Sequence, residues 1–178
     1  MNSQKIIVGV TGGIAAYKAA EIVRGLQKRG FDVWVVMTAS ATKFITALTF
    51  ESLTGHPVCL DLFDNEISPY AHITLAEDAC AMVVAPCTAN TLAKLACGMA
   101  DNALCATALA LEGKLIVAPA MNMHMYLNGA TQENLATLRE RGAFIIEPVS
   151  GHLACGDEGI GKLPEPDFLV EQICEALA

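Results

Sequence analysis

Two loops carry the side chains best suited to hold a polar ligand. Each loop follows a short apolar run that ends in Ala-Pro, at residues 82–86 and again at residues 115–119. The loop residues of interest are Thr88, Ala89, Asn90 and Thr91 in the first case and Asn122 in the second. Amide and hydroxyl groups both donate and accept hydrogen bonds. Asparagines also cap helices, but two loops of the same design favour one shared binding site.

Two further side chains have the chemistry to move protons. One is His72, although a lone histidine is more often a packing or surface residue than a catalyst. The other is Cys155, which lies among four glycines within residues 151–161. This glycine density predicts a mobile loop, and we expect a flap at about residues 150–166. A thiol on a flap can donate or accept a proton; the alternative is a surface loop with an incidental cysteine.

A glycine turn at residues 11–13 joins a predicted strand at 5–10 to a predicted helix at 14–29. Such a turn can bind phosphate through bare amides and the helix N-terminus, or the glycines can simply permit a tight turn. The next predicted strand, 32–37, ends in hydroxyl residues and lacks the carboxylate that holds a dinucleotide ribose. We therefore predict a mononucleotide, with its phosphate near Gly13, Thr38 and Ser40, and disfavour a nicotinamide dinucleotide.

The elements that position these residues alternate between strand and helix. Further strands are expected at 58–60, 82–86, 114–117 and 144–146, and helices at 40–53, 71–76, 91–98, 101–111, 122–127, 131–141 and from 167 to 177. Thr131 and Asp167 are the predicted caps of the last two helices. Core candidates are Phe44, Leu48, Leu53, Cys80, Cys97, Cys105 and Cys174. The pattern predicts a single α/β domain over 1–178, a three-layer Rossmann-like or flavodoxin-like fold with an open parallel sheet and helices on both faces.

The composition narrows the function classes. A net charge of −8 argues against nucleic acid, and no apolar run approaches the roughly 18 residues that a membrane span needs. With 53% apolar and 17% charged residues, surplus apolar surface predicts a homo-oligomer. Seven scattered cysteines show no metal-binding spacing. This spacing predicts that no metal is bound. The N-terminus is a poor signal-peptide core, so we expect a cytoplasmic protein.

Five motifs in order resemble one family. They are residues 9–18, residues 71–73, the loop at 86–91, Pro119-Ala120-Met121-Asn122 with Met125, and Ala154-Cys155-Gly156. Together they resemble the homo-oligomeric flavin-containing cysteine decarboxylases over nearly the whole chain. Departures are Cys87, where Ala or Ser is more usual, and Tyr126, where the family often has tryptophan.

This resemblance implies an FMN enzyme that decarboxylates 4'-phosphopantothenoylcysteine to 4'-phosphopantetheine in coenzyme A biosynthesis. It implies FMN bound between subunits of a trimer, or of a dodecamer of trimers, and a separate phosphopantothenate-cysteine ligase as a possible partner. Relatives with other roles remain alternatives: decarboxylases of a C-terminal peptidyl cysteine, regulatory subunits that inhibit a phosphatase, and, least favoured, flavin prenyltransferases.

The resemblance also assigns roles to residues. His72 would be the base or proton shuttle, Asn122 would hold the substrate carboxylate and amide, and Cys155 would protonate the ene-thiolate. Thr88, Asn90, Asp101 and Asn102 would hold FMN or the neighbouring subunit. With the residues inferred above, the predicted cofactor-binding set is Gly12, Gly13, Ile14, Ala15, Thr38, Ser40, Phe44, Thr88, Ala89, Asn90, Thr91 and Asp101. The substrate-binding set is Asn122, Met125, Ala154, Cys155 and Lys162.

Overall fold

A five-stranded parallel sheet forms the centre of the computed structural model, which describes residues 3–63, 67–152 and 156–178. The strand order is β2-β1-β3-β4-β5. The strands are β1 (Lys5–Val10), β2 (Asp32–Met37), β3 (Ala79–Cys87), β4 (Lys114–Pro119) and β5 (Phe144–Ile145). This order is the flavodoxin-like one, in which ligands bind where the strand order reverses, at the carboxyl ends of the strands. The predicted fold class is confirmed.

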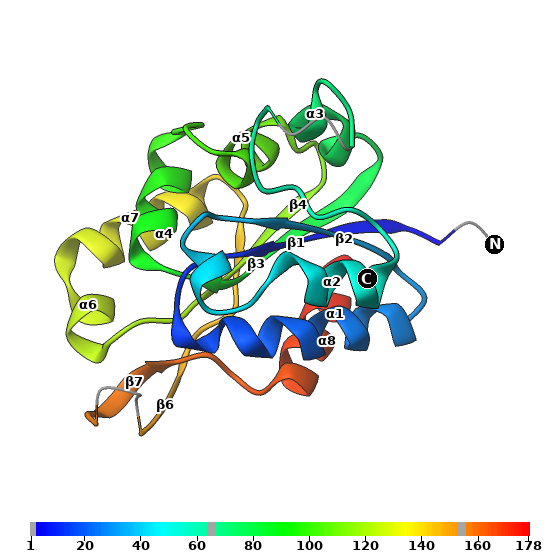
Figure 1. The fold of residues 1–178 in the computed structure, drawn as a ribbon. Helices are drawn as coiled ribbons and strands as arrows, with labels where there is room; N and C mark the ends of the chain where they lie inside the picture. Colours follow the sequence, from blue (N-terminus) through cyan, green and yellow to red (C-terminus); the bar gives the residue numbers. More distant parts are fainter. Residues whose placement is uncertain (1–2, 64–66, 153–155) are drawn as a thin grey trace.

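Helices cover both faces of the sheet (Figure 1). One face carries α1 (Lys18–Lys28), α2 (Ala47–Thr54) and α8 (Pro166–Leu177). The other carries α3 (Ala71–Ala76), α4 (Ala89–Cys97), α5 (Ala103–Ala110) and α7 (Gly129–Glu140). The short elements are the 3-10 helices η1 (Ile14–Tyr17) and η2 (Ala41–Lys43), helix α6 (Met123–Leu127) and the strands β6 (Val149–His152) and β7 (Glu158–Lys162).

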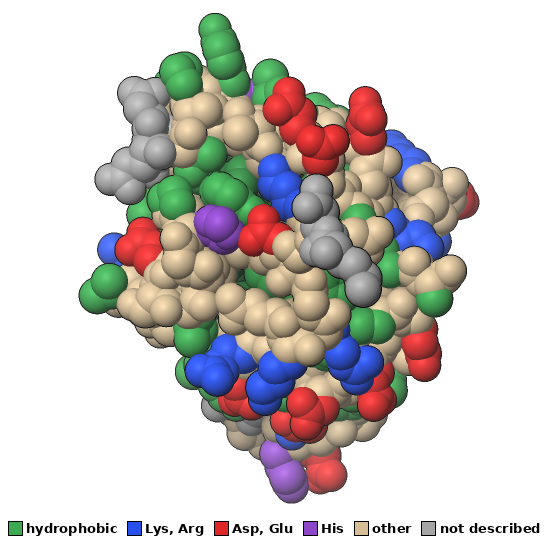
Figure 2. All heavy atoms as spheres, turned by 90° about the vertical axis from the view of Figure 1, so that its right-hand side faces the viewer, with side chains coloured by type: hydrophobic (Ala, Val, Ile, Leu, Met, Phe, Trp, Pro, Cys, Tyr) green, Lys and Arg blue, Asp and Glu red, His purple; other side chains and the backbone are tan. Residues whose placement is uncertain are grey.

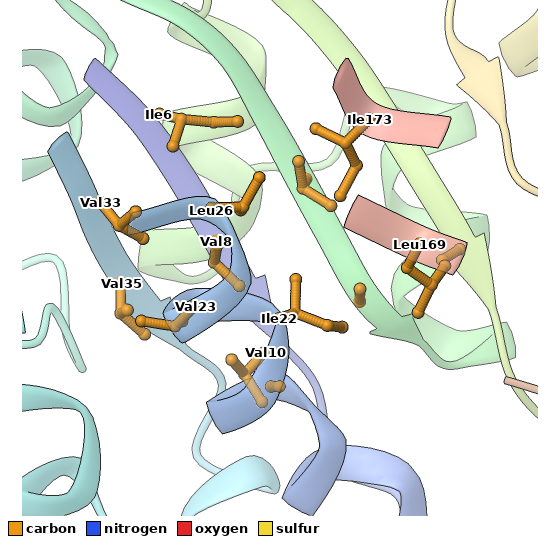
Figure 3. Packing of buried hydrophobic residues seen from close by; sticks show 14 of the residues in the cluster. Ile6, Val8, Val10, Ile22, Val23, Leu26, Val33, Val35, Leu169 and Ile173 are labelled. Atoms are coloured by element: carbon orange, nitrogen blue, oxygen red, sulfur yellow. The ribbon is translucent and has the colours of Figure 1, made fainter. Parts of the chain in front are cut away.

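Alternation along the strands divides the core between the two faces. Ile6, Val8 and Val10 of β1 point toward α1 and α8, where they pack with Ile22, Leu26, Leu169 and Ile173 (Figure 3). Ile7, which lies between Ile6 and Val8 on β1, points to the other face of the sheet and belongs to the buried cluster under α3, α4 and α5. Both faces of the central strands are therefore buried, which explains why their sequences are continuously apolar.

The end of the sheet where the strands begin lies opposite α6 and the β6–β7 hairpin (Figure 1). Figure 2 shows this side, where basic and acidic side chains are intermingled. Among the described residues, no helix is long and apolar enough to cross a membrane.

The predicted helix at 40–53 is wrong in its middle. η2 ends at Lys43, and α2 starts only after Thr46, whose extended backbone places it at the N-cap. Phe44 and Leu48 are 51% and 67% exposed, so neither is a core residue, whereas Leu53 is partly buried. The predicted strand at 58–60 is a single bridge between Val36 and Cys59, because Pro57 has no amide hydrogen to extend the ladder.

Several predicted helix ends and cysteine positions also need correction. Asn128 caps α7, while Thr131 is buried inside its first turn. Glu165 occupies the N-cap position of α8, followed by proline at the first helical position, so Asp167 lies in the first turn and is not the cap. Cys97 is exposed at the end of α4, and only Cys105 of the four predicted core cysteines is fully buried.

The glycine-rich segment forms structure that we had not expected. β6 and β7 pair antiparallel, from Val149 with Lys162 to His152 with Glu158. A Cβ on Gly159 would lie 3.0 Å from Met123 Cγ, and Gly161 has φ +134° and backs onto Met121. These two glycines allow β7 to pack against the start of α6, so part of the glycine density serves close packing. Ala154 and Cys155 of the predicted flap lie outside the described residues.

Candidate functional site

Two adjoining cavities lie at the carboxyl ends of β1, β3 and β4. The first cavity has a volume of about 560 Å³ and is lined by Gly12, Gly13, Ile14, Ala15, Tyr17, Lys18, Pro86, Thr88, Ala89, Ala120, Met121, Asn122, Met125, His152, Gly161, Lys162 and Leu163. The second measures about 510 Å³ and is lined by Gly12, Thr38, Ala39, Ser40, Thr88, Ala89, Asn90, Thr91, Lys94, Asp101, Asn102 and Met125. Their shared residues, Gly12, Thr88, Ala89 and Met125, make them one continuous site of a size typical for small ligands.

Thr11 joins the two central strands where the cavities begin. Its hydroxyl donates to the carbonyl oxygen of Pro86 at 2.7 Å and accepts from the amide of Thr88 at 3.0 Å. The side chain is fully buried. This double contact fixes the glycine turn after β1 against the Thr88 loop after β3. We did not predict a role for Thr11; its hydroxyl directly before Gly-Gly was the available signal.

β3 does not end at Ala-Pro as predicted; it runs through a cis Ala85–Pro86 bond to Cys87. Pairing with β4 shifts register between Val84 and Cys87, since proline cannot contribute a donor there. Despite this shift, β3 still leads into the loop at Thr88 and β4 into the loop at Asn122.

The glycine turn is shaped by close contact with the loop after β2. A Cβ on Gly12 would overlap the Ser40 side chain and lie 2.8 Å from its carbonyl carbon. Only glycine therefore lets this loop approach and bring Thr38 and Ser40 beside the turn, where both line the second cavity. Of the predicted group Gly13, Thr38 and Ser40, the structure places Thr38 and Ser40 in the second cavity together with Gly12, whereas Gly13 lines the first cavity.

Residues of the first polar loop (88–91) both cap helix α4 and line the cavities. Thr88 caps α4 by accepting from the amide of Thr91 at 3.3 Å. Asn90 is exposed in the first turn of α4 and lines the second cavity, so it is not the cap. Capping alone therefore does not account for this asparagine.

Asn122 in the second loop is both a cap and a donor into the site. Its Oδ1 accepts from the amide of His124 at 2.8 Å, which caps α6. Its Nδ2 donates to Oδ2 of Asp157 at 2.8 Å. The side-chain amide thus has the orientation to donate to a carboxylate at the edge of the first cavity.

An anchored tyrosine holds the helix that follows Asn122. Tyr126 is only 6% exposed, and its hydroxyl donates to Glu147 Oε2 at 2.5 Å. Glu147 also forms an ion pair with Arg139 of α7. Burial and the hydrogen bond to Glu147 raise the pKa of Tyr126 to about 12. α6, with Met125 on its cavity side, is therefore fixed to α7 and to the chain before β6.

Charged groups in the second cavity balance one another. Lys94 Nζ lies 2.6 Å from Asp101 Oδ2, and this contact lowers the pKa of the Asp101 carboxyl. Asn102 caps α5 by accepting from the amide of Cys105 at 3.0 Å. The second cavity thus offers a ligand hydroxyl groups, amide groups and a carboxylate whose charge is balanced by Lys94.

The first cavity carries basic side chains at one side. Lys18 is 6% exposed, and its Nζ lies 3.0 Å from Glu165 Oε1. Lys162, a predicted substrate residue, lies 3.7 Å from the same Glu165 oxygen. Lys18, Tyr17 and His152 line this cavity without having been assigned to the site. The signal for Lys18 was a lysine one turn after the glycine turn.

The structure does not bring every predicted residue to the cavities. His72 lies on α3 and lines neither cavity, and its buried Nδ1 has no hydrogen-bond partner in the described part of the chain. Phe44 is half-exposed and also lines neither. Cys155 and Ala154 lie outside the described ranges. No group of histidine, cysteine and acidic residues able to hold a metal occurs among the described residues.

Comparison with known proteins places the chain in context. A profile described as Flavoprotein matches residues 1–178. The coenzyme A biosynthesis bifunctional protein CoaBC of Mycobacterium bovis is 47% identical over 164 residues, which cover 92% of this chain and 39% of that protein. The chain therefore spans about two fifths of the length of this relative.

Solved structures are similar over almost their whole length. A PPC decarboxylase mutant complexed with pantothenoylaminoethenethiol superposes with a TM-score of 0.86 at 30% identity, covering 98% of both chains. The FMN-dependent cysteine decarboxylase SpaF gives 0.81 at 32% identity, covering 98% of this chain and 97% of that one.

Proposed function

The chain belongs to the flavoprotein family, and we propose that it is an FMN-dependent decarboxylase that converts 4'-phosphopantothenoylcysteine to 4'-phosphopantetheine in coenzyme A biosynthesis. The observation that carries the proposal is the pair of joined cavities, one largely apolar and one lined by hydroxyls and amides. The side-chain amide of Asn122 lies at the edge of the first cavity and donates to Asp157. We propose that residues 1–178 form one decarboxylase domain.

FMN fits the donor groups that the two cavities offer. Its flat ring suits the apolar lining, which includes Ile14, Ala15, Met121 and Met125. Its polar chain and phosphate suit the second cavity, where the close approach at Gly12 brings Thr38 and Ser40 next to Thr88. The residues that would hold FMN are Gly12, Gly13, Ile14, Ala15, Thr38, Ser40, Thr88, Ala89, Asn90, Thr91 and Asp101. Phe44 would contribute only from a position outside both cavities.

When bound, FMN supplies the reversible two-electron oxidation of the thiol-bearing carbon that allows carbon dioxide to leave. The chain's own residues orient the substrate and move its protons. The Asn122 amide donates to the substrate carboxylate, as it now donates to Asp157. Met125 packs against the substrate from α6. Cys155 would donate a proton to the ene-thiolate, and the two electrons that complete the conversion to product would return from reduced FMN.

His72 acts in this proposal as the proton acceptor for a site on a neighbouring copy of the chain. Two observations support it: His72 is absent from the cavities of its own chain, and its Nδ1 has no partner within the described residues. It is flanked by Tyr70 and Ile73, which are 66% and 44% exposed. Exposed apolar side chains around an unpaired imidazole are what a subunit contact would bury. These observations favour a homo-oligomer, and from the family resemblance we propose a trimer, alone or within a dodecamer.

The test begins with the absorption spectrum of the purified protein, followed by carbon dioxide release from 4'-phosphopantothenoylcysteine. Flavin bands with turnover are expected; a protein that cannot be loaded with FMN would refute the proposal. Co-expression of His72→Asn with Asn122→Ala tests the shared site. If histidine and asparagine come from different copies, mixed oligomers regain part of the activity that each variant alone lacks.

A second candidate is decarboxylation of a C-terminal peptidyl cysteine, favoured by the 32% identity to the cysteine decarboxylase SpaF. Mass spectrometry with both substrates separates the two functions. We also propose a cytoplasmic location and, because the CoaBC relative is bifunctional and much longer, a phosphopantothenate-cysteine ligase activity in a linked or separate partner.

A further inference from the structure

Helix α3, which carries His72, is too short to hold its own position. It has 6 residues, and isolated helices of that length are not stable in water. Ala71 and Leu75 are fully buried in the cluster shared with α5, whereas His72 lies on the less buried side of the helix. The direction in which His72 points therefore depends on the groups that hold the two ends of α3.

Lys5, at the start of β1, holds the C-terminal end of α3. Its Nζ atom donates to the carbonyl oxygen of Thr74 at 2.6 Å and to that of Glu77 at 3.0 Å. The last carbonyl groups of a helix have no partner within the helix and carry a partial negative charge. An ammonium group supplies both the donor and the opposite charge, and hydrogen bonds from a charged donor are stronger than neutral ones. Lys5 thus links a central strand to the helix that carries His72.

The ammonium group of Lys5 is itself held by an aromatic side chain. It lies 5.5 Å from the centre of the Trp34 ring, which is within the range of a cation–π contact. Trp34 stacks on His56, with ring centres 3.9 Å apart, and its Nε1 donates to Asp32 at 2.9 Å. His56 Nε2 lies 2.7 Å from the other carboxylate oxygen of Asp32. Side chains of β2 and of the segment after α2 therefore fix the place of this ammonium group.

The N-terminal end of α3 has neutral and local contacts. Tyr70 occupies the N-cap position without a capping hydrogen bond from its side chain. The hydroxyl oxygens of Ser68 and Thr74 lie 2.8 Å apart, and Ser68 Oγ accepts from the amide of Tyr70 at 3.0 Å. These contacts join α3 to the segment directly before it. The two bonds from Lys5 span 69 and 72 positions of the chain, and they tie α3 to the sheet.

We propose that Lys5 is a positioning residue for the decarboxylation, because it fixes α3 so that the His72 imidazole reaches the substrate site of the neighbouring copy of the chain. The inference rests on the proposed function, in which His72 accepts a proton in that site. Lys5 and the residues of α3 line neither cavity of their own chain. Loss of the ammonium group should therefore impair the step that uses His72 and leave FMN binding intact.

Lys5→Met removes the ammonium group and keeps the length of the side chain, and Lys114→Met is the matched control. Lys114 begins β4 as Lys5 begins β1, and its Nζ donates at 2.6 Å to the carbonyl oxygen of Ala176 near the end of α8. With the FMN-loaded enzyme, kcat for carbon dioxide release is expected to fall about ten- to a hundredfold in Lys5→Met and to stay within about twofold in Lys114→Met. FMN affinity should equal that of the wild type in both variants. An unchanged kcat in Lys5→Met, or a loss of FMN affinity as large as the loss of kcat, would overturn the inference.

Mixed oligomers test in which site the effect of Lys5 is felt. Co-expression of Lys5→Met with Asn122→Ala should restore activity, because the Asn122→Ala chains supply a correctly held His72 to the sites of the Lys5→Met chains. Co-expression of Lys5→Met with His72→Asn should restore none, because both chains then lack a working histidine. The opposite pattern would place the effect of Lys5 in the cavities of its own chain and contradict the proposal.

Amide hydrogen exchange gives a readout that does not depend on turnover. Lys5→Met should speed exchange in residues 71–77 by about tenfold, whereas Lys114→Met should leave that segment unchanged. Wild-type exchange rates there in Lys5→Met would show that Lys5 does not hold α3. A wild-type enzyme that releases no carbon dioxide, or a fully active His72→Asn variant, would refute the proposed function and this inference with it, an outcome distinct from a normal kcat in Lys5→Met alone.

Discussion

Replacing Gly12 by alanine tests the central contact of the site. The added Cβ would lie 2.8 Å from the carbonyl carbon of Ser40, and backbone cannot rotate away as a side chain can. The turn that carries Thr38 and Ser40 must therefore move. Overpacking of this kind costs about 1–3 kcal/mol, which for a chain of this size corresponds to a Tm lower by roughly 2–12 °C.

The matched variant is Gly13→Ala, whose Cβ would be 3.9 Å from its nearest neighbour, the Thr88 Cγ2 atom. Calorimetric melting of both variants without flavin separates the steric effect from cofactor binding, and Gly13→Ala should stay within about 1 °C of the wild type. Titration with FMN then follows, with affinity expected to fall about tenfold or more for Gly12→Ala. A wild-type Tm and wild-type flavin affinity for Gly12→Ala would refute the proposed packing of the two turns.

Three other variants test the remaining parts of the site. Tyr126→Phe should lose about 1 kcal/mol of unfolding free energy, measured by urea titration. Because the folded pKa of Tyr126 is raised from 10.0 to about 12, its stabilisation is complete below pH 10 and is lost as the pH rises through 12; Tyr126→Phe should lack this decline, and an unchanged alkaline profile would contradict the assignment. His72→Asn should retain bound flavin by absorption but release no carbon dioxide, and full activity would remove His72 from the mechanism. Cys155→Ser should release carbon dioxide but form no 4'-phosphopantetheine by mass spectrometry, and normal product would exclude Cys155 as the proton donor.

Sequence patterns were sufficient for the strands of the parallel sheet and for the two polar loops that line the cavities. The strands at 5–10 and 32–37 have the predicted bounds because their apolar runs are bracketed by glycine or polar residues. The two polar loops meet at one edge because parallel strands end on the same side. Helix starts were less predictable: Asn128 rather than Thr131 caps α7, since either side chain could do so locally.

The features that sequence did not disclose are long-range ones. Thr11 contacts Pro86 across 75 positions, and Lys18 meets Glu165 across 147. No local pattern encodes such partners. The β6–β7 hairpin was likewise missed, because the packing of Gly159 on α6 and of Gly161 on the loop before it becomes visible only when the fold brings them together.

If Asn122 binds the substrate carboxylate as we propose, its hydrogen bond to Asp157 makes substrate binding an exchange of ligands. The amide already donates to a carboxylate of its own chain, so an arriving substrate carboxylate replaces a similar partner. Asp157 is therefore an intramolecular competitor, and the apparent affinity falls with the fraction of chains in which it occupies the amide. Because the contact is exposed to solvent, its release costs little. Asp157 keeps the Asn122 amide oriented when no substrate is bound. Since both partners of this amide are carboxylates, substrate selectivity would depend on other groups of the substrate.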